Sequence, residues 1–224
     1  MKIVRIQYNI EYIHILTSRE EYKQAVVPYF SFDKLRYAID NENTINESIR
    51  LIFTIEHLAV FIRKEGLTFI FEGDIGELKS QNGVIKVFWD LFQNIKGIKG
   101  FKRCTKHSLI INAVELVEKP LIDNILENNP YLPKNPFGKL TEFACIYEFL
   151  KDGIYYKYQF GNYSEKDITT YELRPFSTEY TKELLDGLGY MWRVELKEET
   201  KEPTFSKFKT LLNNSEQVIS KFDI

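Results

Sequence analysis

The sequence predicts an α+β fold: an N-terminal ferredoxin-like half, followed by a half built from an antiparallel meander with two helices. Three observations support this fold class. Apolar residues alternate along several stretches, as in half-buried strands, whereas residues 84–95 repeat them with a helical period. The stretches over residues 1–117 follow the order β-α-β-β-α-β, which is that of a ferredoxin-like unit. Asp152-Gly153, between two alternating stretches, is typical of a two-residue hairpin turn.

The elements of the N-terminal half follow from these periods. Alternation from Val4 to Leu16 predicts a long first strand with His14 on its apolar side. Two short helices are expected next, one ending before Pro28 and one beginning at Ser31. The remaining elements expected in this half are a strand at 49–62, a strand at 67–72, a helix at 84–95 and a strand at 106–117.

Three prolines mark the expected boundary between the halves. Pro130, Pro133 and Pro136 prevent regular structure in residues 128–139. We therefore expect one unit at 1–127, a Pro-rich connection at 128–139 and a second unit at 140–224. The second unit is predicted to contain the hairpin, a strand at 167–174, a helix at 177–187, a strand at 190–197 and a helix capped by Thr204.

The hairpin at 140–163 has a register that can be counted outward from its turn. Phe149 then faces Tyr156, Tyr147 faces Tyr158 and Cys145 faces Phe160 on an aromatic side. On the second side Leu150 faces Tyr155, Glu148 faces Lys157 and Ile146 faces Gln159. This second side is too apolar to be plainly solvated, so we expect the helix at 204–222 or a protein partner to cover it.

Composition excludes several classes of protein. A net charge of −2 and a pI near 6.0 give no general attraction to nucleic acid or anionic membrane. Cys104 and Cys145 are too few for a disulfide framework or a four-cysteine zinc site, so we expect reduced thiols in the cytoplasm. No apolar run reaches the roughly 18 residues of a membrane span. Abundant Ile, Lys and Asn are typical of an AT-rich bacterial or phage genome.

No motif identifies a reaction. Glycine-rich phosphate loops and the G-x-S-x-G motif are absent, so neither a nucleotide cofactor nor serine hydrolysis is expected. His-x-x-x-His and Cys-x-x-Cys are absent as well, so no metal is expected. The sharpest catalytic candidates are Asp186, Glu195 and Lys197, which could hold Mg²⁺ and position a water. An outward row of charged residues on a solvated strand is the better explanation of Glu195 and Lys197, because Glu-x-Lys is common and Asp186 is expected in the last turn of a helix rather than on a partner strand.

Two further sets of residues are candidates for binding. A basic segment with an interleaved aromatic could hold single-stranded nucleic acid; it comprises Lys96, Lys99, Phe101, Lys102, Arg103 and Lys106. Aromatic residues outside the expected core could bind protein; they are Tyr131, Phe137, Tyr155, Tyr163 and Tyr171.

The leading hypothesis is a non-enzymatic intracellular binding module, an accessory or assembly subunit that acts through protein–protein contacts. The first alternative is an RNA- or single-strand-binding protein that uses residues 96–106. The second is a Mg²⁺-dependent nuclease that uses Asp186, Glu195 and Lys197.

Overall fold

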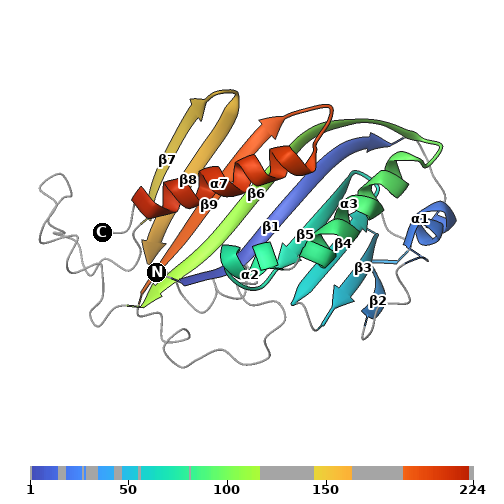
Figure 1. Ribbon diagram of the computed structural model, residues 1–224, viewed down its shortest axis with the longest axis horizontal. Helices are drawn as coiled ribbons and strands as arrows, with labels where there is room; N and C mark the ends of the chain where they lie inside the picture. Colours follow the sequence, from blue (N-terminus) through green and yellow to red (C-terminus); the bar gives the residue numbers. More distant parts are fainter. Residues whose placement is uncertain are drawn as a thin grey trace, which may run out of the picture.

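A computed structural model describes residues 2–14, 19–26, 28, 35–42, 47–54, 57–80, 82–116, 144–162 and 189–221. Within these residues the strands form one nine-stranded sheet in the order β2-β3-β4-β5-β1-β6-β9-β8-β7, and every neighbouring pair is antiparallel (Figure 1). The strands are β1 (Lys2–His14), β2 (Leu35–Asp40), β3 (Ser48–Phe53), β4 (Leu58–Arg63), β5 (Gly66–Phe71), β6 (Phe101–Leu116), β7 (Ala144–Lys151), β8 (Ile154–Asn162) and β9 (Gly189–Glu199).

The described helices are α1 (Arg19–Val26), α2 (Ile75–Ser80), α3 (Asn82–Lys96) and α7 (Phe205–Lys221). Figure 1 shows α2, α3 and α7 in front of the sheet, with α3 over its middle strands and α7 over β6, β8 and β9. We call the side of the sheet that these helices cover the helix face. No helix of the described part of the chain is long and apolar enough to cross a membrane.

The helix face holds the core. One row of directly opposite residues crosses all nine strands, and its interior members are buried whereas both of its ends are exposed. The row is Tyr37, Leu51, Val60, Phe69, Tyr8, Leu109, Leu196, Tyr156 and Phe149. Phe88 and Phe92 of α3 and Phe208 and Leu212 of α7 pack in the same cluster. The amphipathic helices therefore supply the second layer that a one-sided apolar sheet needs.

The neighbouring row belongs to the opposite side, which we call the polar face. It runs Ala38, Arg50, Phe61, Thr68, Asn9, Ser108, Lys197, Tyr155 and Leu150. The alternation of the strand fixes this division, because successive side chains point to opposite sides of the sheet.

Most individual elements confirm the sequence-based expectations. The first strand, the first short helix, the helix around 84–95 and the final strand all appear. The cap of α7 is also confirmed, since the Thr204 hydroxyl accepts a hydrogen bond from Lys207 N at 3.2 Å. The hairpin register is correct at every predicted pair.

The predicted fold class was wrong in its architecture. The described residues show no separate ferredoxin-like half; β6 pairs with β9, so strands from both expected halves share one continuous sheet. Residues 35–40 are strand β2 rather than helix, because Leu35, Tyr37 and Ile39 also alternate with period two. The expected single strand at 49–62 is two strands, which a turn containing His57 (φ 50°) separates. The Pro-rich segment at 128–139 lies outside the described residues, so the domain boundary stays a prediction.

Candidate binding surfaces

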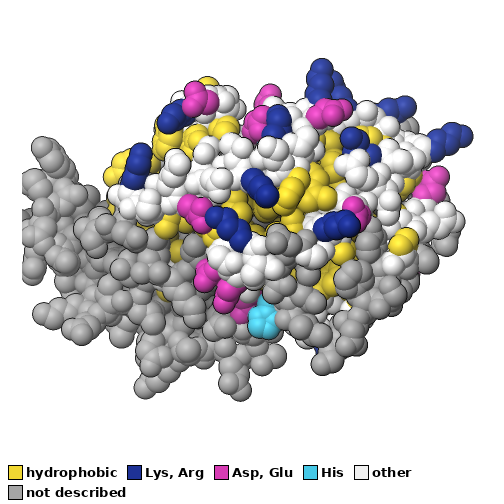
Figure 2. Space-filling model, viewed as in Figure 1, with side chains coloured by type: hydrophobic (Ala, Val, Ile, Leu, Met, Phe, Trp, Pro, Cys, Tyr) yellow, Lys and Arg dark blue, Asp and Glu magenta, His cyan; other side chains and the backbone are white. Residues whose placement is uncertain are grey.

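Strand β7 forms one edge of the sheet and exposes large apolar side chains on both of its sides. Ile146 is 54% exposed, Tyr147 53%, Phe149 44% and Leu150 72%. Hydrophobic surface is visible over the hairpin at the left of the described part of the molecule (Figure 2). An edge strand presents a row of unpaired backbone groups, so an exposed apolar edge is a template for pairing with another chain.

The turn of the hairpin explains why β7 has this register. Asp152 (φ 52°) and Gly153 (φ 78°) both adopt positive φ, which is the requirement of a type I′ turn. Glu148 forms an ion pair with Lys157 at 3.1 Å on the polar face. Two hydrogen bonds lower the pKa of the Glu148 carboxyl from its ordinary value. The bond with Tyr155 has the larger effect, and the bond with Lys157 has the smaller one. The charge on the middle of β7 is therefore balanced within the hairpin itself.

Helix α7 covers the aromatic side of the hairpin, and only in part. Asn214 donates a hydrogen bond to the Tyr156 hydroxyl at 2.9 Å, and Tyr156 and Tyr158 are buried. Phe149 stacks on Tyr156 with ring centroids 4.7 Å apart, yet it remains exposed beyond the helix. Because α7 lies on this side, it does not cover Ile146 and Leu150 on the polar face.

The opposite edge strand, β2, differs from β7. Arg36 is exposed, and Asp40 forms an ion pair with Arg50 at 3.0 Å. Tyr37 is its one exposed large apolar residue among those described. Charged side chains on an edge discourage pairing, so β7 is the edge that is better suited to an interaction.

The polar face carries a string of side-chain hydrogen bonds along β1. Arg5 Nη2 donates to Gln7 Oε1 at 2.7 Å, and Gln7 Nε2 donates to Asn9 Oδ1 at 2.9 Å. Thr68 Oγ1 donates to the same Asn9 oxygen at 3.1 Å and accepts from Arg63 Nη1 at 3.4 Å. We call this string the β1 ladder. It connects two arginines through neutral amide and hydroxyl groups, so each partner fixes the orientation of the next.

A hollow of about 690 Å³ lies on the polar face above the β1 ladder, and we call it the β4 hollow. Its charged lining residues are Arg5, Asp40, Glu47, Arg50, Arg63, Lys64 and Glu65. Phe61 lies between two of the cations: the Arg50 guanidinium is 5.9 Å and the Arg63 guanidinium 5.6 Å from the ring centroid. Cation–π contacts of this kind hold guanidinium groups in place over an aromatic ring.

A second hollow, of about 540 Å³, collects part of the predicted basic segment. Arg103 and Lys106 line it together with Lys201, Glu11 and Glu199. Lys106 forms an ion pair with Glu11 at 2.8 Å. Phe101, in contrast, packs on Tyr12 at 5.4 Å between ring centroids. The structure thus brings two cations of the segment together and places its aromatic against the sheet.

A buried polar cluster crosses the helix face beneath α7. The Tyr8 hydroxyl is 2.7 Å from His107 Nδ1, and His107 Nε2 is 2.8 Å from Glu198 Oε2. Lys207 of α7 donates to Glu198 Oε1 at 2.6 Å. Burial lowers the pKa of His107, although its hydrogen bond with Glu198 opposes the shift. Because a carboxylate only accepts, Nε2 carries the proton of neutral His107 and Nδ1 accepts from Tyr8.

The inner half of this cluster is closed to solvent, whereas Glu198 and Lys207 at its outer end are partly exposed. His107 is fully buried and Tyr8 is 1% exposed. Nearby, Cys104 is also buried, and this burial raises the pKa of its thiol to about 11. These groups therefore act in packing and not as exposed nucleophiles or bases.

The other predicted site residues have mixed positions. Glu195 and Lys197 lie on the polar face, where Glu195 is opposite Lys157 and Lys197 is opposite Tyr155. Asp186 lies outside the described residues, as do Tyr131, Phe137, Tyr163 and Tyr171. Among the described residues no three His, Cys, Asp or Glu side chains form a group that could hold a metal ion.

Sequence reasoning did not identify the β4 hollow. Its residues come from five strands and their connections; β2 was expected to be a helix, and β3 and β4 were expected to be a single strand. The available signal for the hollow was the alternation along the first strand, which places Arg5, Gln7 and Asn9 on one side. Polar side chains on one side of a strand are expected to lie beside polar side chains of the neighbouring strands.

Comparisons with known proteins give no assignment. No family model matches the chain, and no curated protein matches it. Among solved structures, a rolling circle replication initiator protein from Geobacillus stearothermophilus aligns with 89% of this chain and 74% of its own, at 10% identity and a TM-score of 0.26. A likeness at this level supports no inference about fold or function.

Proposed function

We propose that this protein is a non-enzymatic assembly module that associates through β7, and that the occupant of this edge is a second copy of the chain. The observation that supports the proposal is the exposure of four large apolar side chains on β7, which has no neighbouring strand on one side among the described residues. Adding a strand to that edge satisfies backbone groups and covers apolar surface in one step.

The backbone geometry limits the registers available to two antiparallel copies of β7. In a two-residue hairpin the residues that flank the turn exchange their backbone hydrogen bonds, here Lys151 and Ile154. The alternate residues Ile146, Glu148 and Leu150 then direct their backbone groups away from β8. A pairing of two copies must therefore place these three residues opposite one another.

A register centred on Glu148 matches the side chains best. It places Ile146 opposite Leu150 of the second copy on the polar face, and Tyr147 opposite Phe149 of the second copy on the helix face. Each exposed apolar residue of β7 then meets another apolar residue. A shift by two residues in either direction places Glu148 against Leu150 or against Ile146, which is less favourable.

The cost of this register is one pair of like charges at the twofold axis. Glu148 of one copy lies opposite Glu148 of the other, and carboxylates in this position repel. Each is already paired with its own Lys157 at 3.1 Å, so the row reads Lys157, Glu148, Glu148, Lys157. We therefore expect Glu148→Gln to strengthen the association and not to abolish it.

The mass in solution tests the association. Light scattering coupled to size exclusion should give twice 26.5 kDa for the parent chain. Ile146→Lys/Leu150→Lys should give a monomer, because two charges would lie in the middle of the paired edge. The matched control is Tyr37→Lys on the other edge strand, which should remain a dimer. A monomeric parent chain at high concentration would overturn the proposal and leave β7 to a different protein.

Cross-linking tests the register. In a Cys145→Ser background, Tyr147→Cys and Phe149→Cys proteins are prepared separately and then mixed under mild oxidation. Non-hydrogen-bonded pairs have Cα atoms about 4.5 Å apart, within the range of a disulfide. A disulfide dimer should form in the mixture and much less in either protein alone. Equal cross-linking in all three samples would show that another register, or none, is used.

A single-stranded nucleic acid partner is a second candidate function, which the second hollow favours. This hollow gathers Arg103, Lys106 and Lys201 on one side of the sheet. The test is a gel shift with a short single strand at two salt concentrations, with Arg103→Ala/Lys201→Ala for comparison. Binding that is unchanged in this variant, or insensitive to salt, would remove the candidate. The nuclease alternative keeps its own test, which is whether Asp186→Ala removes a Mg²⁺-dependent cleavage.

A further inference from the structure

The β4 hollow has features of a ligand site that are independent of the β7 edge. It occupies about 690 Å³, which is within the roughly 300–1,000 Å³ of small-molecule sites. Its base is the β1 ladder, in which every amide and hydroxyl group has a defined partner. A base of this kind is rigid, so a ligand would not have to order it.

The cations of the hollow are not equivalent. Arg50 is neutralised by Asp40 at 3.0 Å. Arg63 is held by Thr68 and by the Phe61 ring, and among the described residues no carboxylate forms an ion pair with it. Lys64 is its neighbour at the turn between β4 and β5 and likewise has no ion-pair partner in the described part of the chain. Two positively charged side chains that are adjacent in sequence thus line the hollow, and one of them, Arg63, is held in orientation by Thr68 and Phe61.

An arginine held in this way is suited to a phosphate group. Its planar fork of N–H donors matches two phosphate oxygens, and a neighbouring lysine adds charge without geometric demand. The Gln7 and Thr68 side-chain oxygens already have partners but each can accept a further hydrogen bond, and together with Ser48 they would contact the hydroxyl groups of a sugar. From this arrangement we propose that the β4 hollow binds a phosphate monoester of nucleotide size through Arg63 and Lys64.

The charge balance separates a nucleotide from a nucleic-acid strand. Basic side chains exceed acidic ones by only one in the hollow, and Glu65 adjoins Lys64. A strand-binding groove typically neutralises about 6–10 phosphates and loses affinity steeply with salt. The hollow has enough charge for one phosphate group. The ligand is therefore a small molecule with a single phosphate site, not a polymer.

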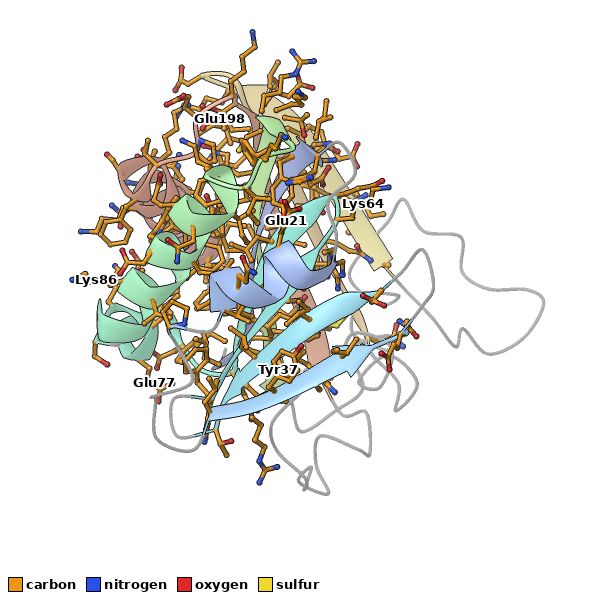
Figure 3. The ribbon with its side chains drawn as sticks, turned by 90° about the vertical axis from the view of Figure 1, so that its right-hand side faces the viewer. Glu21, Tyr37, Lys64, Glu77, Lys86 and Glu198 are labelled. Carbon is orange, nitrogen blue, oxygen red and sulfur yellow. The ribbon has the colours of Figure 1, made fainter. Side chains whose placement is uncertain are left out.

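The test is calorimetric titration with adenosine monophosphate and with inorganic phosphate as probes. Adenosine monophosphate should bind, and raising salt from about 50 mM to about 200 mM should weaken it only by ordinary screening, without the steep salt dependence that counterion release gives a strand. Arg63→Gln should weaken it by about tenfold, since a bidentate pair is lost. The matched control is Lys86→Gln on α3: Figure 3 shows Lys86 and Lys64 at opposite sides of the molecule. This variant should bind like the parent chain.

A second variant keeps the test independent of folding. Lys64 lies at an exposed turn, so Lys64→Gln should leave the fold intact. Weaker binding by this variant, together with an unchanged circular dichroism spectrum, would support the site. The proposal is overturned if neither probe binds at millimolar concentration, or if Arg63→Gln and Lys64→Gln bind as the parent does. It is also overturned if an oligothymidylate binds here much more tightly than adenosine monophosphate and with a steep salt dependence. None of these results bears on the β7 dimer.

Discussion

The His107–Glu198–Lys207 cluster should make a large contribution to stability, and Glu198→Leu tests it. Leucine keeps the bulk of the side chain but removes the carboxylate that serves two donors. His107 Nε2, which is fully buried, would lose its acceptor at 2.8 Å. Lys207 would lose its bond at 2.6 Å and keep its contact with Thr200 at 2.9 Å. Glu198→Leu therefore removes one buried hydrogen bond, at His107, and one partly exposed hydrogen bond, at Lys207.

The two losses differ in size. An unsatisfied buried donor costs about 1–3 kcal/mol. The Lys207 pair contributes roughly 0.5 kcal/mol, because Lys207 is 39% exposed and solvent screens it. We expect the free energy of unfolding to fall by about 1.5–3.5 kcal/mol in total. For a chain of this length that corresponds to a melting temperature lower by roughly 3–14 °C.

Urea unfolding at pH 7.5 measures this difference, and Glu216→Leu is the matched control. Glu216 is also on α7 and also pairs with a lysine, Lys79 of α2, at 2.9 Å. That pair is exposed, so its loss should cost less than about 1 kcal/mol. If Glu198→Leu and Glu216→Leu have equal effects, the argument from burial is refuted.

The pH dependence gives a second check. His107 has a lowered pKa in the folded state, so below its ordinary value of 6.5 the unfolded chain binds a proton that the folded chain resists. Stability should therefore decrease as pH falls from 7.5 to 5. Partial burial raises the pKa of Glu198, but hydrogen bonds from Lys207 and His107 outweigh it, and the net pKa is lowered. The stability that ionised Glu198 contributes is lost as pH falls below its ordinary pKa of 4.5. The Glu198→Leu variant should not show this loss of stability in acid.

Three further predictions concern glycines and thiols. Gly153→Ala should cost about 1–2 kcal/mol through its positive φ alone, because nothing lies within 4 Å of the added carbon; urea unfolding measures it. Gly73→Ala should lower the free energy of unfolding by more, because the added carbon would also meet Phe71 and the Glu77 carboxylate, which accepts a hydrogen bond from Asp74 N. An equal loss of stability in the two glycine variants would contradict this. Cys104, buried and with a pKa near 11, should react with a thiol reagent at pH 8 only on unfolding, whereas Cys145 should react in the native state; mass spectrometry of each cysteine decides it.

Local pairing was predictable from sequence, whereas sheet order was not. The Asp152-Gly153 turn fixes the hairpin register by short-range geometry, so counting from the turn gave every pair correctly. The partner of β6 is β9, more than seventy residues later in the chain, and no local pattern specifies this pairing. The alternation of apolar residues shows where strands lie but not which strands are neighbours in the sheet. A ferredoxin-like order was therefore inferred for what is only part of a larger sheet.

Short elements were the other source of error. Leu35, Tyr37 and Ile39 alternate over only six residues, where helical and strand periods overlap. Ile55 continued the alternation of residues 49–62, so the turn at His57 was not recognised. The exposed residues of β7 were recognised as apolar from the sequence, but their exposure depends on where α7 ends over the hairpin. The β4 hollow depends on the same long-range order, which is why it was missed.

The sheet order also constrains how the chain folds during synthesis. Among the described strands, the β7–β8 hairpin joins the sheet only through β9, which is made after it. Until β9 emerges from the ribosome, the hairpin has two open edges and β6 has one, and all are rich in apolar residues. Late, long-range pairing of this kind is slow. The interval before β9 is complete is therefore when the chain is most exposed to aggregation, and chaperone binding should concentrate on nascent chains of that length.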